Sequence, residues 1–320
     1  MSKRIRHGFV VALFLGITTT PLLAGPNPPP PQAVNPADGC GQTLPKATDN
    51  GTKEYVLTGD LACSGAVSGV IIAASDVVFH LAGHTISNTT CDLNVTFGGI
   101  FVQGGISGVQ IDGGTVSGFN DGIILSSSNS RVRSMRVANA CVFGMAVSGQ
   151  NNRIETSVVT ASGVDGIGLG QASGTVVTAN DISGNARVGV DISNFSNANI
   201  VENNLINNNG TTEGYGVAIF NGTNNLIRGN AVNGNVNGIG IDSPGNLARD
   251  NTVSGSTNTG IAISTVGAPS TVRRNSVLGS GVTDMSDGSA NCGTNIWRHN
   301  TFHTDLVVGV ADGGPGAGCI

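Results

Sequence analysis

The chain of 320 residues has few charged and few aromatic side chains: Asp, Glu, Lys and Arg together make up 11% of it, and Phe, Trp and Tyr 4%. So little charge excludes an ordinary helical domain, which needs Ala, Leu, Glu and Lys in quantity. The net charge of −5 leaves no basic field over the chain, so neither nucleic acid nor an anionic membrane is expected as a partner. No segment beyond the N-terminus is apolar over the length that a membrane span requires.

The N-terminus has the pattern of a cleaved secretion signal. Lys3, Arg4 and Arg6 precede the short apolar run Gly8–Ile17, and small residues ending at Ala24 offer a cleavage site. We predict a signal peptide over residues 1–24, followed by a proline-rich spacer over residues 25–39. The mature protein is then expected to be secreted or periplasmic, with no membrane span.

The six cysteines fit that oxidising compartment. Their number is even and none forms a Cys-x-x-Cys pair, so disulfides are favoured over a metal site. Cysteines near the two ends of the chain are expected to pair locally, and the middle pair follows by elimination. The expected disulfides are Cys40–Cys63, Cys91–Cys141 and Cys292–Cys319.

A glycine followed by an apolar-x-apolar triplet recurs eight times, at steps of 23, 22, 22, 23, 27, 22 and 22 residues. Alternation within the triplet is the period of a β-strand whose two outer side chains point inward. Short strands repeated about every 22 residues predict stacked coils, that is, a parallel β-solenoid. The repeat glycines are Gly99, Gly122, Gly144, Gly166, Gly189, Gly216, Gly238 and Gly260.

A column of asparagines recurs with the same period, each two residues before an apolar residue. We expect glycine and asparagine at the corners of the coils, because both tolerate a left-handed backbone. Stacked asparagines can also hydrogen-bond from coil to coil as a ladder. The asparagine column is Asn180, Asn204, Asn230, Asn251, Asn275 and Asn300.

The repeats, the segment YVLTGDLAC (Tyr55–Cys63) and the segment SDGSANCGTNIWRHNTF (Ser286–Phe302) carry a family resemblance. The sequence resembles the bacterial right-handed parallel β-helix repeat proteins, a superfamily that includes NosD-like and pectate-lyase-like members. The repeat period predicts about ten coils over residues 70–305, and the resemblance implies that they form a single right-handed parallel β-helix. Because the open ends of a solenoid invite pairing with another chain, we expect an N-terminal cap over residues 40–69, tied by its disulfide, and a C-terminal cap or tail over residues 306–320. It specifies no activity, since the architecture hosts many functions.

Four arginines one coil apart form an outward-facing column in the C-terminal half. Their guanidinium groups could bind the carboxylates or sulfates of an acidic polysaccharide. A solvated row screened by salt is the alternative that we favour. Phe143 and Tyr215 belong to another column and are further ligand-binding candidates, because an aromatic ring can stack on a sugar. The arginines are Arg228, Arg249, Arg273 and Arg298, and among earlier members of the column we expect Arg133 to pair with Glu155 and Glu202 with Arg228.

Three aspartates are candidate catalytic acids. Asp121 and Asp165 are two coils apart, about 9.5 Å, which is close to the separation of the two acids of an inverting glycosidase. An Asp-Gly turn explains both of them more simply. Asp191 stands alone in an outward column of small residues, where an aspartate is ordinarily solvated. Asp284 and Asp287 are too few to define a calcium site, so we expect no cofactor and retain calcium only as a weak alternative.

The favoured function is therefore a non-catalytic module outside the cytoplasm that binds a polysaccharide or a cell-surface glycan. The alternative is a carbohydrate-active enzyme: a polysaccharide lyase, a hydrolase or an epimerase. The resemblance weighs against this alternative, because lyases of the fold need a basic residue beside calcium-binding acids, and hydrolases need paired aspartates with a nearby histidine. No lysine follows Lys53, and neither motif is present.

A weaker alternative is a metal-handling accessory of the NosD kind. Four of the five histidines form two pairs, His80 with His84 and His299 with His303. About nine coils separate the pairs, so they cannot share one ion. Each pair offers only two nitrogens, with no methionine or free cysteine cluster beside it. The sequence therefore predicts no metal site.

Overall fold

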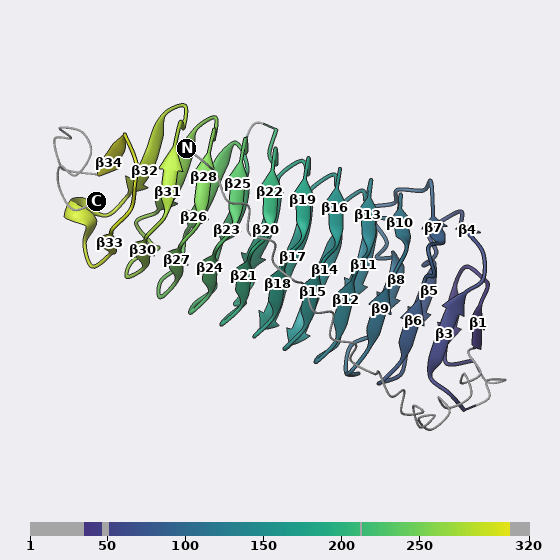
Figure 1. Ribbon diagram of the computed structural model, residues 1–320. Coiled ribbons are helices and arrows are strands. Elements are labelled where there is room, and N and C mark those ends of the chain that lie inside the picture. The colour runs from purple at the N-terminus through teal and green to yellow at the C-terminus, as the bar shows by residue number, and fades with distance from the viewer. Residues whose placement is uncertain (1–34, 47–50, 212, 308–320) are drawn as a thin grey trace, which may run out of the picture. The chain divides into compact units, whose positions relative to one another are not determined.

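The computed structural model describes residues 35–46, 51–211 and 213–307 of the chain. The predicted signal peptide, residues 25–34 of the spacer and the tail beyond residue 307 lie outside this described part. Within it, parallel coils stack in a single row, from β1 at one end to β34 at the other (Figure 1). None of its helices has both the length and the apolar character needed to cross a membrane.

Three parallel sheets run along the coils, and each full coil contributes one strand to sheet A, then one to sheet C, then one to sheet B. Sheet A consists of β1 (Asn35–Ala37), β3 (Glu54–Leu57), β6 (Val78–His80), β9 (Gln110–Asp112), β12 (Arg131–Arg133), β15 (Arg153–Glu155), β18 (Val176–Thr178), β21 (Ile200–Glu202), β24 (Leu226–Arg228), β27 (Leu247–Arg249), β30 (Thr271–Arg273) and β33 (Ile296–Arg298). Sheet B consists of β2 (Gln42–Leu44), β5 (Val70–Ile72), β8 (Gly98–Val102), β11 (Asp121–Leu125), β14 (Met145–Gln150), β17 (Asp165–Ser173), β20 (Val188–Ser193), β23 (Tyr215–Ile219), β26 (Asn237–Ile241), β29 (Thr259–Ile263), β32 (Thr283–Asp287) and β34 (Asp305–Val307). Sheet C consists of β4 (Leu61–Ala62), β7 (Thr85–Ser87), β10 (Thr115–Ser117), β13 (Arg136–Ala138), β16 (Val158–Thr160), β19 (Asp181–Ser183), β22 (Leu205–Asn207), β25 (Ala231–Asn233), β28 (Thr252–Ser254) and β31 (Ser276–Leu278). The single 3₁₀ helix of the described residues is η1 (Ala290–Cys292).

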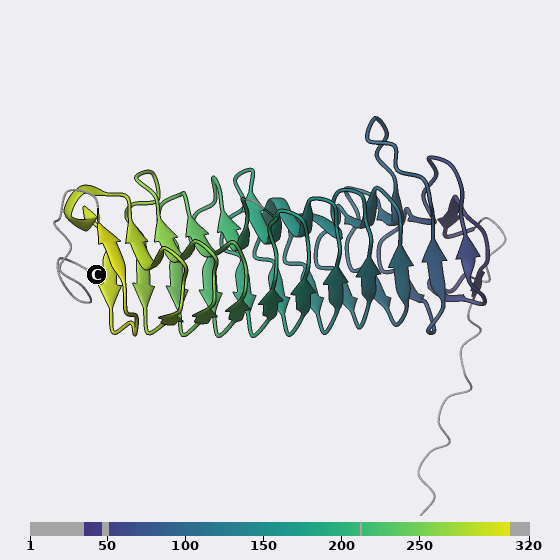
Figure 2. The ribbon, with the colours of Figure 1, turned by 90° about the horizontal axis from the view of Figure 1, so that it is seen from above.

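The predicted parallel solenoid is confirmed, but its length is not. Sheets A and B have 12 strands each and sheet C has 10, so there are about twelve coils rather than about ten. The difference arises at the N-terminal end, where the segments assigned to the spacer and the cap already contribute β1 to β4 to the same sheets. The view along the perpendicular direction shows the strands of successive coils following one another in register (Figure 2).

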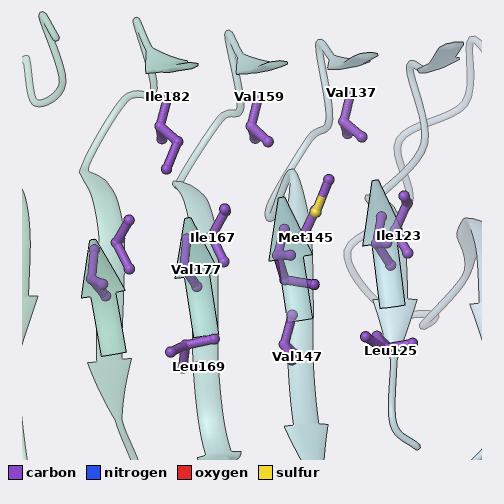
Figure 3. Packing of buried hydrophobic residues seen from close by; sticks show 14 of the residues in the cluster. Ile123, Leu125, Val137, Met145, Val147, Val159, Ile167, Leu169, Val177 and Ile182 are labelled. Carbon is purple, nitrogen blue, oxygen red and sulfur yellow. The ribbon is translucent and has the colours of Figure 1, made fainter. Parts of the chain in front are cut away.

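The core is a column of aliphatic side chains enclosed by the three sheets. The inward residues of each predicted triplet meet their counterparts in the next coil, as Ile123 does Met145 and Met145 does Ile167. All three are fully buried. Figure 3 shows Val137 and Val159 of sheet C approaching this column from the other side. Because every coil repeats the same arrangement, the apolar periodicity in the sequence maps directly onto the core.

The repeat glycines serve packing rather than backbone freedom. None of them has a positive φ angle, so the expected left-handed backbone is not found at these glycines; it is found at other corner residues, such as Gly229, Gly234 and Asn203. A Cβ atom at Gly166 would lie 2.7 Å from Cγ2 of Ile182 and 2.7 Å from the carbonyl oxygen of Gly189. Real Cβ atoms do not approach so closely, so the chain needs glycine where sheet C packs tightly against the start of each sheet B strand.

The asparagine ladder is confirmed. The side-chain oxygen of Asn204 accepts hydrogen bonds from the backbone N–H of Asn180 at 2.9 Å and from its side-chain amide at 3.0 Å. The left-handed residue lies one position earlier than predicted, for example at Ala179 with φ of 55°. The structure contains two further asparagine ladders that were not predicted from the sequence. They consist of Asn185, Asn209 and Asn235, and of Asn199, Asn225 and Asn246.

Two of the three predicted disulfides are confirmed. Cys40 and Cys63 join the first coils with their Cα atoms 5.7 Å apart, and Cys91 pairs with Cys141 at 6.0 Å. Cys319 lies outside the described residues, so the Cys292–Cys319 disulfide stays a prediction. Both of these disulfides lie on the N-terminal side of the asparagine ladders, whose first members are Asn180, Asn185 and Asn199.

Candidate functional site

The outward face of sheet B carries the predicted column of small residues with one aspartate. In strand register, Gly168 of β17 neighbours Asp191 of β20, which neighbours Ala218 of β23, which neighbours Gly240 of β26. Each step is about 4.8 Å, so this stretch of the face extends over about 14 Å. Three of its four positions have no side chain larger than a methyl group, so the surface around Asp191 is flat.

Asp191 is joined to Asp165 through Arg187, a residue that the sequence analysis missed. The Arg187 Nε atom donates to Oδ1 of Asp165 at 2.9 Å, and Nη2 donates to Oδ2 of Asp191 at 3.0 Å and also to Oδ2 of Asp165. Asp165 additionally accepts the backbone N–H of Val188 at 3.1 Å. We call these three residues the acid–guanidinium centre. Two carboxylates sharing one guanidinium leave one negative charge in excess, and no described residue forms a hydrogen bond with Oδ1 of Asp191.

The interpretation of Asp191 as a solvated surface residue is wrong. The residue is only 6% exposed, and Asp165 is fully buried. Burial and the negative charge of Asp165 raise the pKa of Asp191 to about 6, although the Arg187 guanidinium pulls it down. The contact with Asp165 in turn raises the pKa of Arg187, which stays charged. Asp191 therefore changes its protonation near neutral pH while the cation beside it does not.

Two aromatic rings lie on the same face, one on each side of the centre. A Cβ atom at Gly168 would lie 3.3 Å from Cδ1 of Phe143, and one at Gly240 would lie 2.5 Å from Cε1 of Tyr215. Each ring therefore covers a glycine of the outward column. Tyr215 also makes an edge contact with Phe220, with ring centroids 6.0 Å apart. Aromatic faces set along a flat strand surface are suited to stacking on rings of a ligand.

Two hollows meet at the centre. The larger has a volume of about 660 Å³ and is lined by Arg187, Tyr215 and Phe220 among others. The smaller, of about 190 Å³, is lined by Phe143 and Asp191. Because Arg187 and Asp191 are hydrogen-bonded to each other, the two hollows adjoin at that contact. Burial raises the pKa of the Tyr215 hydroxyl, and the nearby negative charges of Asp242 and Glu213 raise it further.

Asp121 does not join this centre. Its side chain accepts the backbone N–H of Phe143 at 3.1 Å, one coil onward, as Asp165 accepts that of Val188. Burial raises the pKa of Asp121, and the hydrogen bond from Phe143 offsets part of the effect. Asp121 is the first residue of β11 and not part of a turn, so the turn interpretation is wrong for it, and the contact gives it a structural role between coils. The structure thus pairs Asp165 with Asp191 instead of with Asp121.

A signal for Arg187 was present in the sequence. It lies 22 residues after Asp165, one coil onward, and four residues before Asp191. A search for opposite charges one coil apart would have found the first contact. The second contact could not be read from spacing, because it depends on how the chain turns into β20.

The arginine column on sheet A is confirmed in its register: Arg228, Arg249, Arg273 and Arg298 follow one another on neighbouring strands. The four are not equivalent, however. Arg228 pairs with Glu202, as predicted, and Arg249 pairs with Asp250 at 2.5 Å. Arg273 and Arg298 form no ion pair with any described residue.

Further along the column, the predicted Arg133–Glu155 pair is wrong. Arg133 pairs with Asp112 at 3.0 Å, while Glu155 is held by Arg131 and Arg153. Glu155 therefore takes its partners from the other outward column of sheet A, which lies close enough to reach the same carboxylate.

The residues considered for metal binding have other partners. His80 contacts Asp112 at 2.7 Å and Glu54 at 3.3 Å. Asp287 accepts the indole N–H of Trp297 at 2.7 Å, and Asp284 accepts the backbone N–H of His303 at 2.9 Å. Within the described residues, no group of three or more His, Cys, Asp or Glu side chains is placed to hold an ion. These contacts support a structural role for Asp284 and Asp287 in the last coils.

Comparison with known proteins identifies the family. The family model described as right handed beta helix region matches residues 64–206, 98–247 and 157–307, which overlap and together span most of the chain. The chain belongs to the right-handed β-helix family. The handedness implied by the sequence resemblance is thereby confirmed. No curated protein matches the sequence significantly.

Several solved structures of right-handed β-helices are similar to the chain in fold. They include an alginate lyase from Paenibacillus sp. strain FPU-7 (15% identity, TM-score 0.59, covering 79% of this chain and 90% of that one). The A-module of the Azotobacter vinelandii mannuronan C-5 epimerase AlgE4 has 16% identity and a TM-score of 0.57, covering 79% and 86%. The Dettilon tailspike protein gp208 has 14% identity and a TM-score of 0.55, and this chain, 79% of it covered, spans 61% of the tailspike. At such identities the likeness establishes the fold alone.

Proposed function

We propose that this β-helix is a carbohydrate-binding module outside the cytoplasm, and that it binds a polysaccharide or cell-surface glycan along the outward face of sheet B. The observation that carries the proposal is the arrangement of Phe143 and Tyr215 over Gly168 and Gly240, with the acid–guanidinium centre between them. The rings offer stacking surfaces, while Arg187 and Asp191 offer a donor and an acceptor for hydroxyl groups. Few polar groups on a flat, partly apolar floor are typical of ligand sites.

Two further facts support this proposal. The similar structures include an alginate lyase and a mannuronan epimerase, whose names refer to polysaccharides. The Cys40–Cys63 and Cys91–Cys141 disulfides suit an oxidising compartment, in keeping with secretion or export to the periplasm.

The acid–guanidinium centre also favours a second candidate function, an enzyme acting on glycosidic linkages. Asp191 is buried beside a hollow, and its pKa of about 6 suits a group that gives or takes a proton near neutral pH. In that case Asp191 would exchange the proton, and Arg187 would hold the carboxylate in place. The binding module remains the favoured function, because a shared guanidinium also explains the buried carboxylates as structure.

One assay separates the two functions. The purified protein is incubated with a panel of neutral and acidic polysaccharides, and both binding and newly formed chain ends are measured. We expect binding without new chain ends, and a loss of binding of at least about tenfold in a Phe143→Ala, Tyr215→Ala double variant. Leu205→Ala, which removes an exposed apolar side chain on sheet C, is the control and should bind normally.

Chain ends that accumulate with the wild-type protein and disappear with Asp191→Asn would establish the enzyme instead. Binding that is equal in the aromatic double variant and in the wild type would overturn the proposed binding face.

A further inference from the structure

Arg273 and Arg298 differ from the other arginines of their column, because neither forms an ion pair with a carboxylate of the described residues. Three neighbouring arginines each have a carboxylate partner: Arg228 pairs with Glu202, while Arg249 and Arg274 share Asp250. Arg273 and Arg298 occupy adjacent strands β30 and β33 in direct register, about 4.8 Å apart. Like charges opposite one another are unfavourable, so a pair left uncompensated calls for an anion.

The Arg273 side chain is already partly withdrawn from water. Its Nε atom is buried and has no hydrogen-bond partner within the described residues. A buried donor without an acceptor is costly, and a guanidinium N–H is normally satisfied by carboxylate, sulfate or phosphate oxygens. An oxygen acceptor would satisfy this donor, and a negatively charged one would also offset the repulsion between Arg273 and Arg298.

A hollow of about 420 Å³ lies at these two arginines. Its lining also includes Leu247, Thr271 and Ile296, the other outward residues of sheet A in three successive coils, together with the hydroxyl-bearing Thr294. No acidic residue is among the lining residues. One side of the hollow is therefore cationic, the other carries two apolar side chains on either side of a threonine, and the hollow is large enough for a ring of sugar size.

We propose that this hollow, the arginine pocket, binds an oxyanion carried on a sugar ring: a uronate carboxylate or a sulfate ester. The guanidinium groups of Arg273 and Arg298 bind the oxyanion, and Leu247 and Ile296 contact the apolar face of the ring. The choice of a glycan as carrier rests on the proposed function, but the binding of an oxyanion does not. The pocket lies on sheet A and the acid–guanidinium centre on sheet B, so the two sites can be tested separately.

The test measures binding of the purified protein to sodium polygalacturonate, to dextran sulfate and to neutral dextran by calorimetry at low and high salt. The key variant is Arg273→Gln with Arg298→Gln. A matched control, Lys53→Gln with Arg136→Gln, removes the same charge away from the pocket, since Lys53 contacts only a backbone carbonyl near β6 and Arg136 lies on sheet C. Thermal unfolding verifies that all variants are folded.

We expect at least one of the acidic polymers to bind, with an affinity that falls with salt and falls about tenfold or more in the arginine variant. The charge-matched control should retain its affinity within about twofold. Preference for polygalacturonate identifies a carboxylate, and preference for dextran sulfate identifies a sulfate ester.

Three results would overturn the arginine pocket: no binding of either acidic polymer, an arginine variant that binds as the wild type does, or an equal loss in the charge-matched control. The Phe143→Ala, Tyr215→Ala variant distinguishes the two proposals. If it loses glycan binding while the arginine variant does not, the pocket fails and the proposed function survives. If only the arginine variant loses binding, the sheet B face fails and the pocket survives.

Discussion

On sheet B, Arg187 lies between the carboxylates of Asp165 and Asp191, whereas on sheet A Arg273 and Arg298 follow one another with no carboxylate between them. The strand geometry is the same in both places, since neighbouring coils bring equivalent positions together at one fixed spacing. The two sites differ in the charge of the residue one coil away from the arginine: it is the negative Asp165 for Arg187 and the positive Arg298 for Arg273. In the first site opposite charges meet, and the second carboxylate raises the pKa of Asp191. In the second site two like charges meet with no described carboxylate beside them.

The largest expected effect is at Arg187. Substitution of Arg187 by Gln leaves the fully buried Asp165 carboxylate without its ion pair. Because the Arg187 side chain is half-exposed, the free energy of unfolding should fall by about 2 kcal/mol, less than for a fully buried pair. Chemical denaturation of the two proteins at pH 7 would measure this loss. Adding Asp165→Asn to the variant should restore part of it, because the buried charge is then removed as well. An Arg187→Gln variant as stable as the wild type would show that Asp165 is not held by this pair.

The second effect is a dependence of stability on pH. The pKa of Asp191 is about 6 in the folded protein and near its ordinary, lower value in the unfolded chain, so the folded state binds the extra proton between those values. The contribution of Asp191 to stability is therefore fully present at acidic pH and is lost as the pH rises towards 6 and above. Asp191→Asn should gain melting temperature relative to the wild type between pH 4 and pH 7.

The difference between the two proteins is the quantity to follow, because groups such as Asp284, whose pKa is lowered by backbone N–H donors despite its burial, destabilise the fold in acid in both. A difference in melting temperature that stays constant across this range would contradict the raised pKa of Asp191.

The third effect concerns the aromatic rings that flank the centre. A methyl group at Gly240 would meet the Tyr215 ring at 2.5 Å, so Gly240→Ala should displace the ring and cost about 1 kcal/mol. Gly168→Ala, where the nearest Phe143 atom is at 3.3 Å, should cost only a few tenths of a kcal/mol. Thermal unfolding and glycan binding of both variants test this ranking. Equal effects in the two variants would mean that the position of the Tyr215 ring does not depend on a glycine at position 240.

The smallest expected effect is a change in stability of opposite sign for the same substitution at the two sites. Arg273→Gln relieves the repulsion from Arg298, so it should stabilise the protein by a few tenths of a kcal/mol at low salt, and less at high salt. Arg187→Gln, the same chemical change, should destabilise it. Melting temperatures at two salt concentrations suffice for this test, and destabilisation by Arg273→Gln would indicate a partner that the described residues do not include.

The fold could be predicted in considerable detail because a solenoid repeats its contacts. The spacing of Ile123, Met145 and Ile167 in the sequence is the spacing of the coils, and the pairing register followed from it without further information. The same regularity gave the asparagine ladder and the arginine column. The prediction failed at the role of the repeat glycines, because a close approach between sheets is visible only when the coils are closed.

The candidate site was predictable only in part. Asp165, Asp191, Phe143 and Tyr215 were all singled out from the sequence, but as separate features with different partners. Arg187, which joins two of them, was missed, and Asp121 was grouped with Asp165 although it contacts a backbone N–H instead. Columns predict which residues face outward; they do not predict which side chains bend towards each other.

By itself, the sequence determined the parallel coils, the composition of their core, the outward columns and two observed disulfides, because each of these depends on a period that is written along the chain. The tertiary structure decided which charges meet. Whether an arginine is neutralised depends on the reach of flexible side chains between coils and on the depth of the surface around them. Those properties distinguish the acid–guanidinium centre from the arginine pocket, although the same coil-to-coil repeat positions the residues of both.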